Sequence, residues 1–193
     1  MLKKVLLVIG GIIVLVCLIS LVLPSKVHVE RSIVINAPSA KIFPEVNSLQ
    51  KWSPWDPWQK MDPNIQNTFS GPEAGVGAKN EWKSEKVGNG SQILTESVAN
   101  EKIASALNFG EGRDATGSFN FTAEGEGTKV VWGMDMETGL NPIGKYMGLM
   151  MDGMVGKEFE KGLADLKALV ESMPEEAPVA EAAPADSLAT VAK

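Results

Sequence analysis

An uncharged apolar run of about 19 residues, Val5–Leu23, constrains this chain more than any other feature. At 1.5 Å per residue, a helix of that length spans a hydrocarbon layer of about 30 Å. Lys3 and Lys4 precede the run, and positive charges favour the cytoplasmic side. We therefore expect residues 1–24 to form a transmembrane anchor, with a cytoplasmic N-terminus and an extracytoplasmic remainder.

Two other interpretations of this segment fit the residues less well. A cleaved signal peptide has a shorter apolar core and small residues before the cleavage site. Here the run ends Leu21-Val22-Leu23-Pro24, without such a site. Cys17 could be a lipoprotein cysteine, but Val16 precedes it and the apolar run continues beyond it. The uncleaved anchor is the interpretation that the sequence favours.

The rest of the chain has the size of one ordinary domain, residues 25–173, followed by a tail. The tail, residues 174–193, is rich in proline, alanine and glutamate and is predicted to be disordered. Cys17 is the only cysteine, so packing alone must hold the exported domain together. The net charge of −6 and the lack of a basic stripe argue against nucleic-acid binding.

Short alternating segments after the anchor predict an antiparallel sheet. Val27–Asn36 alternates apolar and polar side chains, which is the period-two pattern of a half-buried strand. Glycine, asparagine and aspartate separate the later segments at short intervals, as in a meander of hairpins. The later predicted strands are Ile65–Ser70, Ala78–Ser84, Ser91–Val98, Lys102–Phe109, Gly117–Glu124 and Lys129–Glu137.

Helices are predicted on either side of the hairpins. Ala40–Leu49 suits one or two short helices, which Pro44 would kink or separate. Trp52–Trp58 holds three tryptophans and two prolines, so we expect an aromatic loop without regular structure. Pro142–Ser172 has apolar residues at three-four spacing and predicts a long helix that covers one face of the sheet. Two glycines in its first half predict a kink or partial unwinding there.

Several segments together carry a resemblance to a known superfamily. They are Val29–Pro38, Trp52-Ser53-Pro54-Trp55, Gly75-Val76-Gly77-Ala78, Gly127–Trp132 and Gly156–Lys167. In this order the chain resembles the START-related helix-grip superfamily (SRPBCC), in its polyketide cyclase/dehydrase-like subgroup. The resemblance implies an α+β fold with a curved antiparallel sheet wrapped around a long C-terminal helix. It also implies a cavity between sheet and helix for a hydrophobic or amphipathic molecule, but a fold names no reaction.

The expected cavity lining combines aromatic and methionine side chains from the sheet with those of the long helix. Methionine adapts to irregular space, so such a lining suits a plastic apolar pocket, although ordinary core packing has the same pattern. The expected lining residues are Trp82, Phe109, Phe119, Phe121, Trp132, Met134, Met136, Tyr146, Met147, Met150, Met151 and Met154. Three tryptophans could form the cavity mouth or rest at the membrane interface, or else close one end of the sheet: Trp52, Trp55 and Trp58.

The sequence predicts no catalytic residue, metal site or cofactor. His28, the only histidine, lies in the first predicted strand, where we expect it to be exposed. Several carboxylates could stand at a cavity rim, although surface charge is their ordinary role: Glu81, Glu96, Glu101 and Asp114. Asp135 is a further carboxylate that an enzyme could use.

These features predict a membrane-anchored extracytoplasmic protein that binds a hydrophobic or amphipathic, lipid-like small molecule. One alternative is a cyclase, dehydratase or hydrolase that uses carboxylates in the same cavity. Another is a structural or interaction module whose core is filled. A buried carboxyl in the cavity would favour the first alternative, and a solid interior would favour the second.

Overall fold

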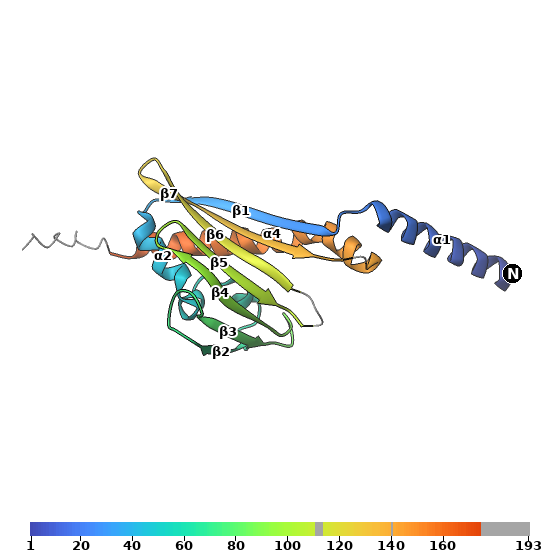
Figure 1. The fold of residues 1–193 in the computed structure, drawn as a ribbon, viewed down its shortest axis with the longest axis horizontal. Coiled ribbons are helices and arrows are strands. Elements are labelled where there is room, and N and C mark those ends of the chain that lie inside the picture. The colour runs from blue at the N-terminus through green and yellow to red at the C-terminus, as the bar shows by residue number, and fades with distance from the viewer. Residues whose placement is uncertain (111–113, 140, 175–193) are drawn as a thin grey trace, which may run out of the picture.

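The structure is a computed structural model that describes residues 1–110, 114–139 and 141–174. An N-terminal helix, α1 (Leu2–Val22), projects away from the rest of the molecule (Figure 1). Seven strands form one antiparallel sheet: β1 (Lys26–Ile35), β2 (Gln66–Ser70), β3 (Lys79–Lys83), β4 (Gly90–Val98), β5 (Lys102–Asn108), β6 (Asp114–Glu124) and β7 (Gly127–Glu137). The remaining elements are α2 (Ser39–Asn47), the 3-10 helix η1 (Leu49–Trp52), α3 (Pro57–Met61) and α4 (Pro142–Ser172).

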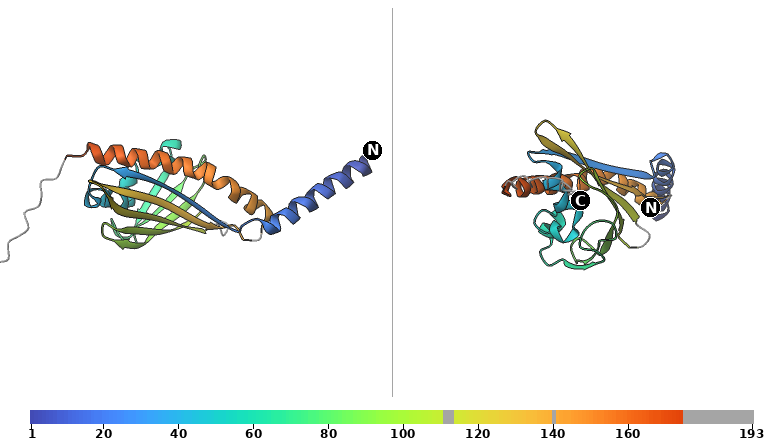
Figure 2. Two further views of the ribbon diagram at one scale, coloured as in Figure 1. Left: turned by 90° about the horizontal axis from the view of Figure 1, so that it is seen from above. Right: turned by 60° about the vertical axis from the view of Figure 1, so that its left-hand side comes forward.

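The first and last strands are neighbours in the sheet, whose order is β1-β7-β6-β5-β4-β3-β2. The pairing of β1 with β7 aligns Val29 with Met134, and the other strands pair as successive hairpins. The sheet curves, and α4 runs along one of its faces beside β1 (Figures 1 and 2). This confirms the predicted helix-grip architecture.

Period-two burial explains why the strands have one covered face. In β1, Val27, Val29 and Ile35 are buried, whereas His28 and Glu30 between them are exposed. In β6 and β7 the buried residues on the same face include Phe119 and Trp132. Alternate side chains point to opposite faces of a strand, so the covered face collects the apolar ones.

The second half of α4 supplies the cover of the core. Phe159, Leu163, Leu166 and Val170 recur at three-four spacing and are almost fully buried. The helix begins with Asn141, whose side chain accepts a hydrogen bond from the amide of Ile143.

The structure tests three local expectations. Pro44 lies inside α2, so Ser39–Asn47 is one helix, which is one of the two expected possibilities. Trp58 belongs to the short helix α3, which corrects the expectation that the tryptophan-rich segment has no regular structure. Helix α4 is continuous from Pro142 to Ser172, so it is not unwound at its early glycines. The predicted tail from residue 175 lies outside the described residues.

Candidate ligand cavity

A cavity of about 130 Å³ lies between the inner face of the sheet and the segment from η1 to α3, which connects β1 to β2. The segment contributes Leu49, Trp52 and Trp58, and the sheet contributes side chains from β2 to β7. Helix α4 contributes only Phe159. An apolar cavity of about 150 Å³ holds a molecule the size of benzene. The observed space therefore suits a single ring or a short apolar chain.

Stacked aromatic rings form one wall of the cavity. Trp132 lies between Phe159 and Phe119, with ring centroids 4.1 Å and 4.9 Å away and nearly parallel planes. Trp58 meets the edge of this stack, at 5.8 Å from Trp132. Aromatic pairs in offset stacks or edge-to-face contacts are favourable beyond their buried area. The wall therefore presents apolar ring surface to the cavity.

Trp52 and Trp55 have different roles although they are close neighbours. Trp52 lines the cavity and donates a hydrogen bond from Nε1 to the carbonyl of Val46 at 2.9 Å. Trp55 is fully buried behind it and does not line the cavity. It packs 5.7 Å from Trp132, and its Nε1 has no partner within the described part of the chain. Trp55 thus packs in the core against Trp132, away from the cavity.

The opposite wall comes from the outer strands of the sheet. Trp82 and Phe109 meet edge to face at 6.0 Å, and both line the cavity. Trp82 pairs with Gly90 across the β3–β4 ladder. A Cβ atom on Gly90 would lie 2.3 Å from the Trp82 ring, so only glycine leaves room for that ring. Gly90 therefore positions an aromatic residue of the cavity.

Polar groups interrupt the apolar lining at a few points. Gln92 donates to the hydroxyl of Ser105 at 3.0 Å, and both residues are buried. The side-chain amide of Asn80 donates a hydrogen bond from Nδ2 to Oδ1 of Asn67 at 3.0 Å, so the Oδ1 atom of Asn80 takes no part in that bond. This Oδ1 atom is buried and has no hydrogen-bond partner among the described residues. A buried acceptor without a partner is costly, so a ligand donor at this wall would be stabilised.

Asp56 is the one carboxylate among the cavity-lining residues of the described chain. It caps α3, where its Oδ1 accepts a hydrogen bond from the amide of Trp58 at 3.0 Å. Burial raises the pKa of Asp56 to about 6, and backbone hydrogen bonds from Trp58 and Gln59 oppose that rise. The carboxyl can therefore change its protonation state close to neutral pH.

Seven of the residues expected at the cavity lie there. Five come from the expected lining and two from the expected mouth: Trp82, Phe109, Phe119, Trp132, Met134, Trp52 and Trp58. Ligand contact by these residues remains a prediction. Sequence reasoning did not select Asp56, Asn80, Gln92 or Phe159, although the Asp56-Pro57 pair matches a helix cap followed by a first-turn proline.

The structure does not place the other expected residues at this cavity. Phe121 lies in the core, where the centroid of its ring is 5.7 Å from that of Phe43. Met136 lies at the C-terminal end of β7. The remaining ones belong to the first half of α4: Tyr146, Met147, Met150, Met151 and Met154. That half reaches beyond the aromatic wall, so the cavity lies under α3 and not under these methionines.

The five carboxylates selected from the sequence also lie away from the cavity. Glu81 pairs with Lys79, Glu96 pairs with Lys102, and Asp135 pairs with the exposed His28. Glu101 and Asp114 are exposed. An enzyme in this cavity could therefore not use these five groups. Among the described residues, no cluster of histidine, cysteine, aspartate or glutamate could hold a metal ion.

Comparison with known proteins places this geometry in a family. The family model described as polyketide cyclase/dehydrase and lipid transport matches residues 26–171. The chain belongs to this family. The match spans every strand and nearly all of α4, so the family domain begins directly after α1. A search of curated proteins finds no match.

Solved structures agree on the fold. A Chromobacterium violaceum protein is 19% identical, with a TM-score of 0.51, over 79% of this chain and 99% of its own. The Aha1 dimer of Colwellia psychrerythraea gives 18% and 0.52, over 76% of this chain and 97% of its own. The di-domain ARO/CYC protein StfQ of the steffimycin biosynthetic pathway gives 11% and 0.57. That match covers 76% of this chain but 51% of StfQ. At these identities the likeness concerns the fold alone.

Proposed function

We propose that this protein is a membrane-anchored, extracytoplasmic binding protein for a small hydrophobic or amphipathic molecule. The observation that carries the proposal is the aromatic-walled cavity with the unpartnered Asn80 acceptor. The family description includes lipid transport, which is consistent with an apolar ligand. The cavity between the sheet and the short helices also argues against a module with a solid interior.

The cavity limits the chemistry of the bound group. Its volume of about 130 Å³ accepts one ring or a short chain, so a longer lipid would place only part of itself inside. The rings of Trp132 and Phe159 favour an apolar group. The oxygens of Asn80 and Asp56 favour a ligand that carries an O–H or N–H donor.

The N-terminal helix supports the membrane part of the proposal. α1 has the length and composition to cross a membrane or to act as a signal sequence, and only Ser20 in it is buried. Lys3 and Lys4 at its start favour a cytoplasmic N-terminus. A tethered cavity would meet membrane-derived molecules at a high local concentration.

Fluorine NMR of two probes tests ligand binding. The full chain in lipid nanodiscs is titrated with 4-fluorophenol and with fluorobenzene, which differ in one donor group. We expect both signals to shift, and 4-fluorophenol to bind more tightly because its hydroxyl meets Asn80 or Asp56. Leu107→Trp fills the cavity wall and should abolish the shift. Ala106→Trp adds the same ring on the exposed face of the same strand and should preserve it. Equal fluorine shifts in both variants would contradict the proposal, because partitioning of the probes into the nanodisc lipid would alone explain them.

Asp56 favours a second candidate function, acid–base chemistry on the bound molecule. A carboxyl with a pKa of about 6 can donate or accept a proton near neutral pH. The test is to incubate the native ligand, identified by native mass spectrometry, with the protein and with Asp56→Asn. If the ligand loses or gains water with the parent protein but not with Asp56→Asn, the protein is an enzyme. If the mass of the ligand stays unchanged, the protein is a carrier.

A further inference from the structure

We infer that the first half of α4 lies in the interface of the lipid leaflet from which α1 emerges, and that it presents an apolar stripe to the lipid. This inference rests on the proposed membrane anchor and goes beyond the proposed function. The stripe consists of Ile143, Met147, Met150 and Met154. These side chains are 74%, 50%, 58% and 55% exposed.

The four residues form one face of the helix. Their spacing of four, three and four residues places them in a single column along α4. The same column continues with Lys157 and Lys161, which are also exposed. The column is therefore apolar near the start of the helix and charged in its second half. This change suits a helix that begins in the apolar layer of a membrane and leaves it at an angle, because its first half then meets lipid and its second half meets water.

Two hydrogen bonds tie this half of α4 to α1. The Tyr146 hydroxyl donates to the carbonyl of Val16, and the Lys145 ammonium donates to the carbonyl of Ser20, both at 3.0 Å. The helical partner of the Ser20 carbonyl would be the amide of residue 24, but Pro24 has no N–H group. Lys145 therefore supplies a donor that the sequence of α1 lacks. It also places a positive charge at the negative end of the α1 dipole.

These bonds fix the depth of α4 relative to α1. Val16 precedes the last residue of α1, Val22, by six positions, which is about 9 Å of helix. If α1 crosses a bilayer, Tyr146 and the neighbouring Met147 and Met150 lie level with its last turns. Tyrosine is enriched at that level of a membrane. Figures 1 and 2 show α1 leaving the molecule at the end where α4 begins.

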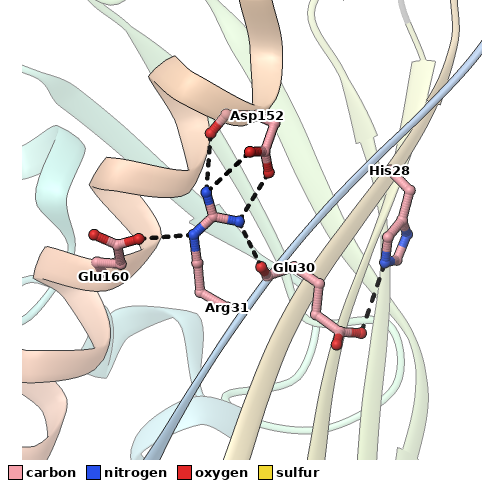
Figure 3. A network of polar contacts seen from close by, with 5 residues as sticks. All are labelled: His28, Glu30, Arg31, Asp152 and Glu160. Atoms are coloured by element: carbon pink, nitrogen blue, oxygen red, sulfur yellow. Dashed lines mark hydrogen bonds and ion pairs between the residues drawn. The ribbon is translucent and has the colours of Figure 1, made fainter.

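A polar clamp fixes the rotation of α4, so the stripe cannot turn inward. Arg31 of β1 forms a two-point ion pair with Asp152 at 2.8 Å and 3.2 Å, and another with Glu160 at 2.8 Å (Figure 3). A Cβ atom on Gly156 would lie 2.2 Å from the guanidinium, so the helix approaches Arg31 closely at this point. Gly148 similarly approaches Val27 of β1. With these contacts on the β1 side of α4, the stripe faces outward beside α1, which selects lipid as its partner.

Spin labels on single cysteines test the inference in the full chain. The background is Cys17→Ala, which removes the only cysteine, in nanodiscs of phosphatidylcholine and phosphatidylglycerol. Labels are placed by Met150→Cys on the stripe, Ala164→Cys on the exposed face of the second half of α4, and Leu15→Cys in α1. Accessibility to oxygen reports lipid, and accessibility to a water-soluble nickel complex reports water. We expect positions 150 and 15 to favour oxygen, and position 164 to favour nickel.

The control positions separate failure of this inference from failure of the anchor. If position 15 is lipid-exposed but position 150 matches position 164, the anchor holds and the inference is overturned. If position 15 is itself in water, both are overturned. Dipolar broadening at position 150 with access to nickel would show a second copy of the chain on the stripe and would also overturn it. Adding Tyr146→Phe should lower the oxygen accessibility at position 150 and leave position 164 unchanged.

Discussion

At the residue scale, Asp56 links the cavity to pH. Its folded pKa of about 6 lies above the ordinary value of 3.8, so the folded state binds a proton more tightly than the unfolded state. Folding stability therefore decreases as the pH rises from about 4 to 6, because the buried carboxylate becomes charged. Raising the pKa of Asp56 from 3.8 to about 6 corresponds to at most about 3 kcal/mol of stability, and residual solvent access reduces this.

Asp56→Asn should thus be more stable than the parent chain at neutral pH. The amide oxygen can still accept the capping hydrogen bond of Trp58, while the cost of the buried charge disappears. We expect a gain of about 1–2 kcal/mol at pH 7.5 that declines towards pH 4.5. Urea unfolding at both pH values measures it, and Glu101→Gln on the exposed surface is the control. A gain that is equal at both pH values would contradict the assigned cause.

Gly90 gives a second prediction at this scale. Gly90→Ala would bring a methyl group within 2.3 Å of the Trp82 ring and 2.7 Å of the Asn108 carbonyl. Because neither the ring nor the strand can move freely, we expect a loss of about 1–3 kcal/mol in the free energy of unfolding. Gly153→Ala is the matched control, since open space surrounds Gly153 in α4, and it should stabilise by up to about 1 kcal/mol. Urea unfolding compares the two, and the tryptophan fluorescence of the folded state should change only in the first.

At the scale of elements, the Arg31 clamp divides α4 into two halves. The second half is held by fully buried apolar side chains such as Phe159 and Leu163, whereas the first half packs through partly buried apolar side chains such as Met151 and Val155 and is tied to β1 by Arg31. The hydrogen bond and charge of Arg31 lower the pKa of Asp152, so the pair persists at neutral pH and weakens as Asp152 is protonated in acid.

Arg31→Met should therefore loosen one half of the helix selectively. Hydrogen exchange of amides 143–155 should accelerate at least several-fold, while amides around Leu163 keep their protection. Arg31→Lys should restore little, because an ammonium cannot form the two-point pair with Asp152. Lys161→Met removes an exposed pair with Glu158 on the same helix and should leave both halves unchanged. Uniform acceleration along α4 would mean that Arg31 stabilises the whole domain instead.

At the scale of the whole molecule, the elements were predictable and the location of the cavity was not. The strands and α4 follow from period-two and three-four patterns, because each has one covered face. The methionines from Met147 to Met154 share the composition of a pocket lining, but Met147, Met150 and Met154 are exposed because their face of α4 points away from β1, which the sequence does not state. The role of Asp56 was not predictable, because the prolines around it indicate an irregular segment. Its raised pKa depends on burial, which the sequence alone does not show.

The charges beside α1 and the position of the family domain predict the orientation of the whole chain in the membrane. Lys3 and Lys4 precede α1, and the family domain begins at residue 26, so the cavity should lie opposite the cytoplasm. Asn100→Cys, on an exposed turn between β4 and β5 and in a Cys17→Ala background, should react with an impermeant maleimide in intact spheroplasts. Leu2→Cys, at the other end of α1, should react only after lysis. The reverse pattern would place the cavity in the cytoplasm, and α4 would then contact the inner leaflet, since its hydrogen bonds to Val16 and Ser20 hold in either orientation.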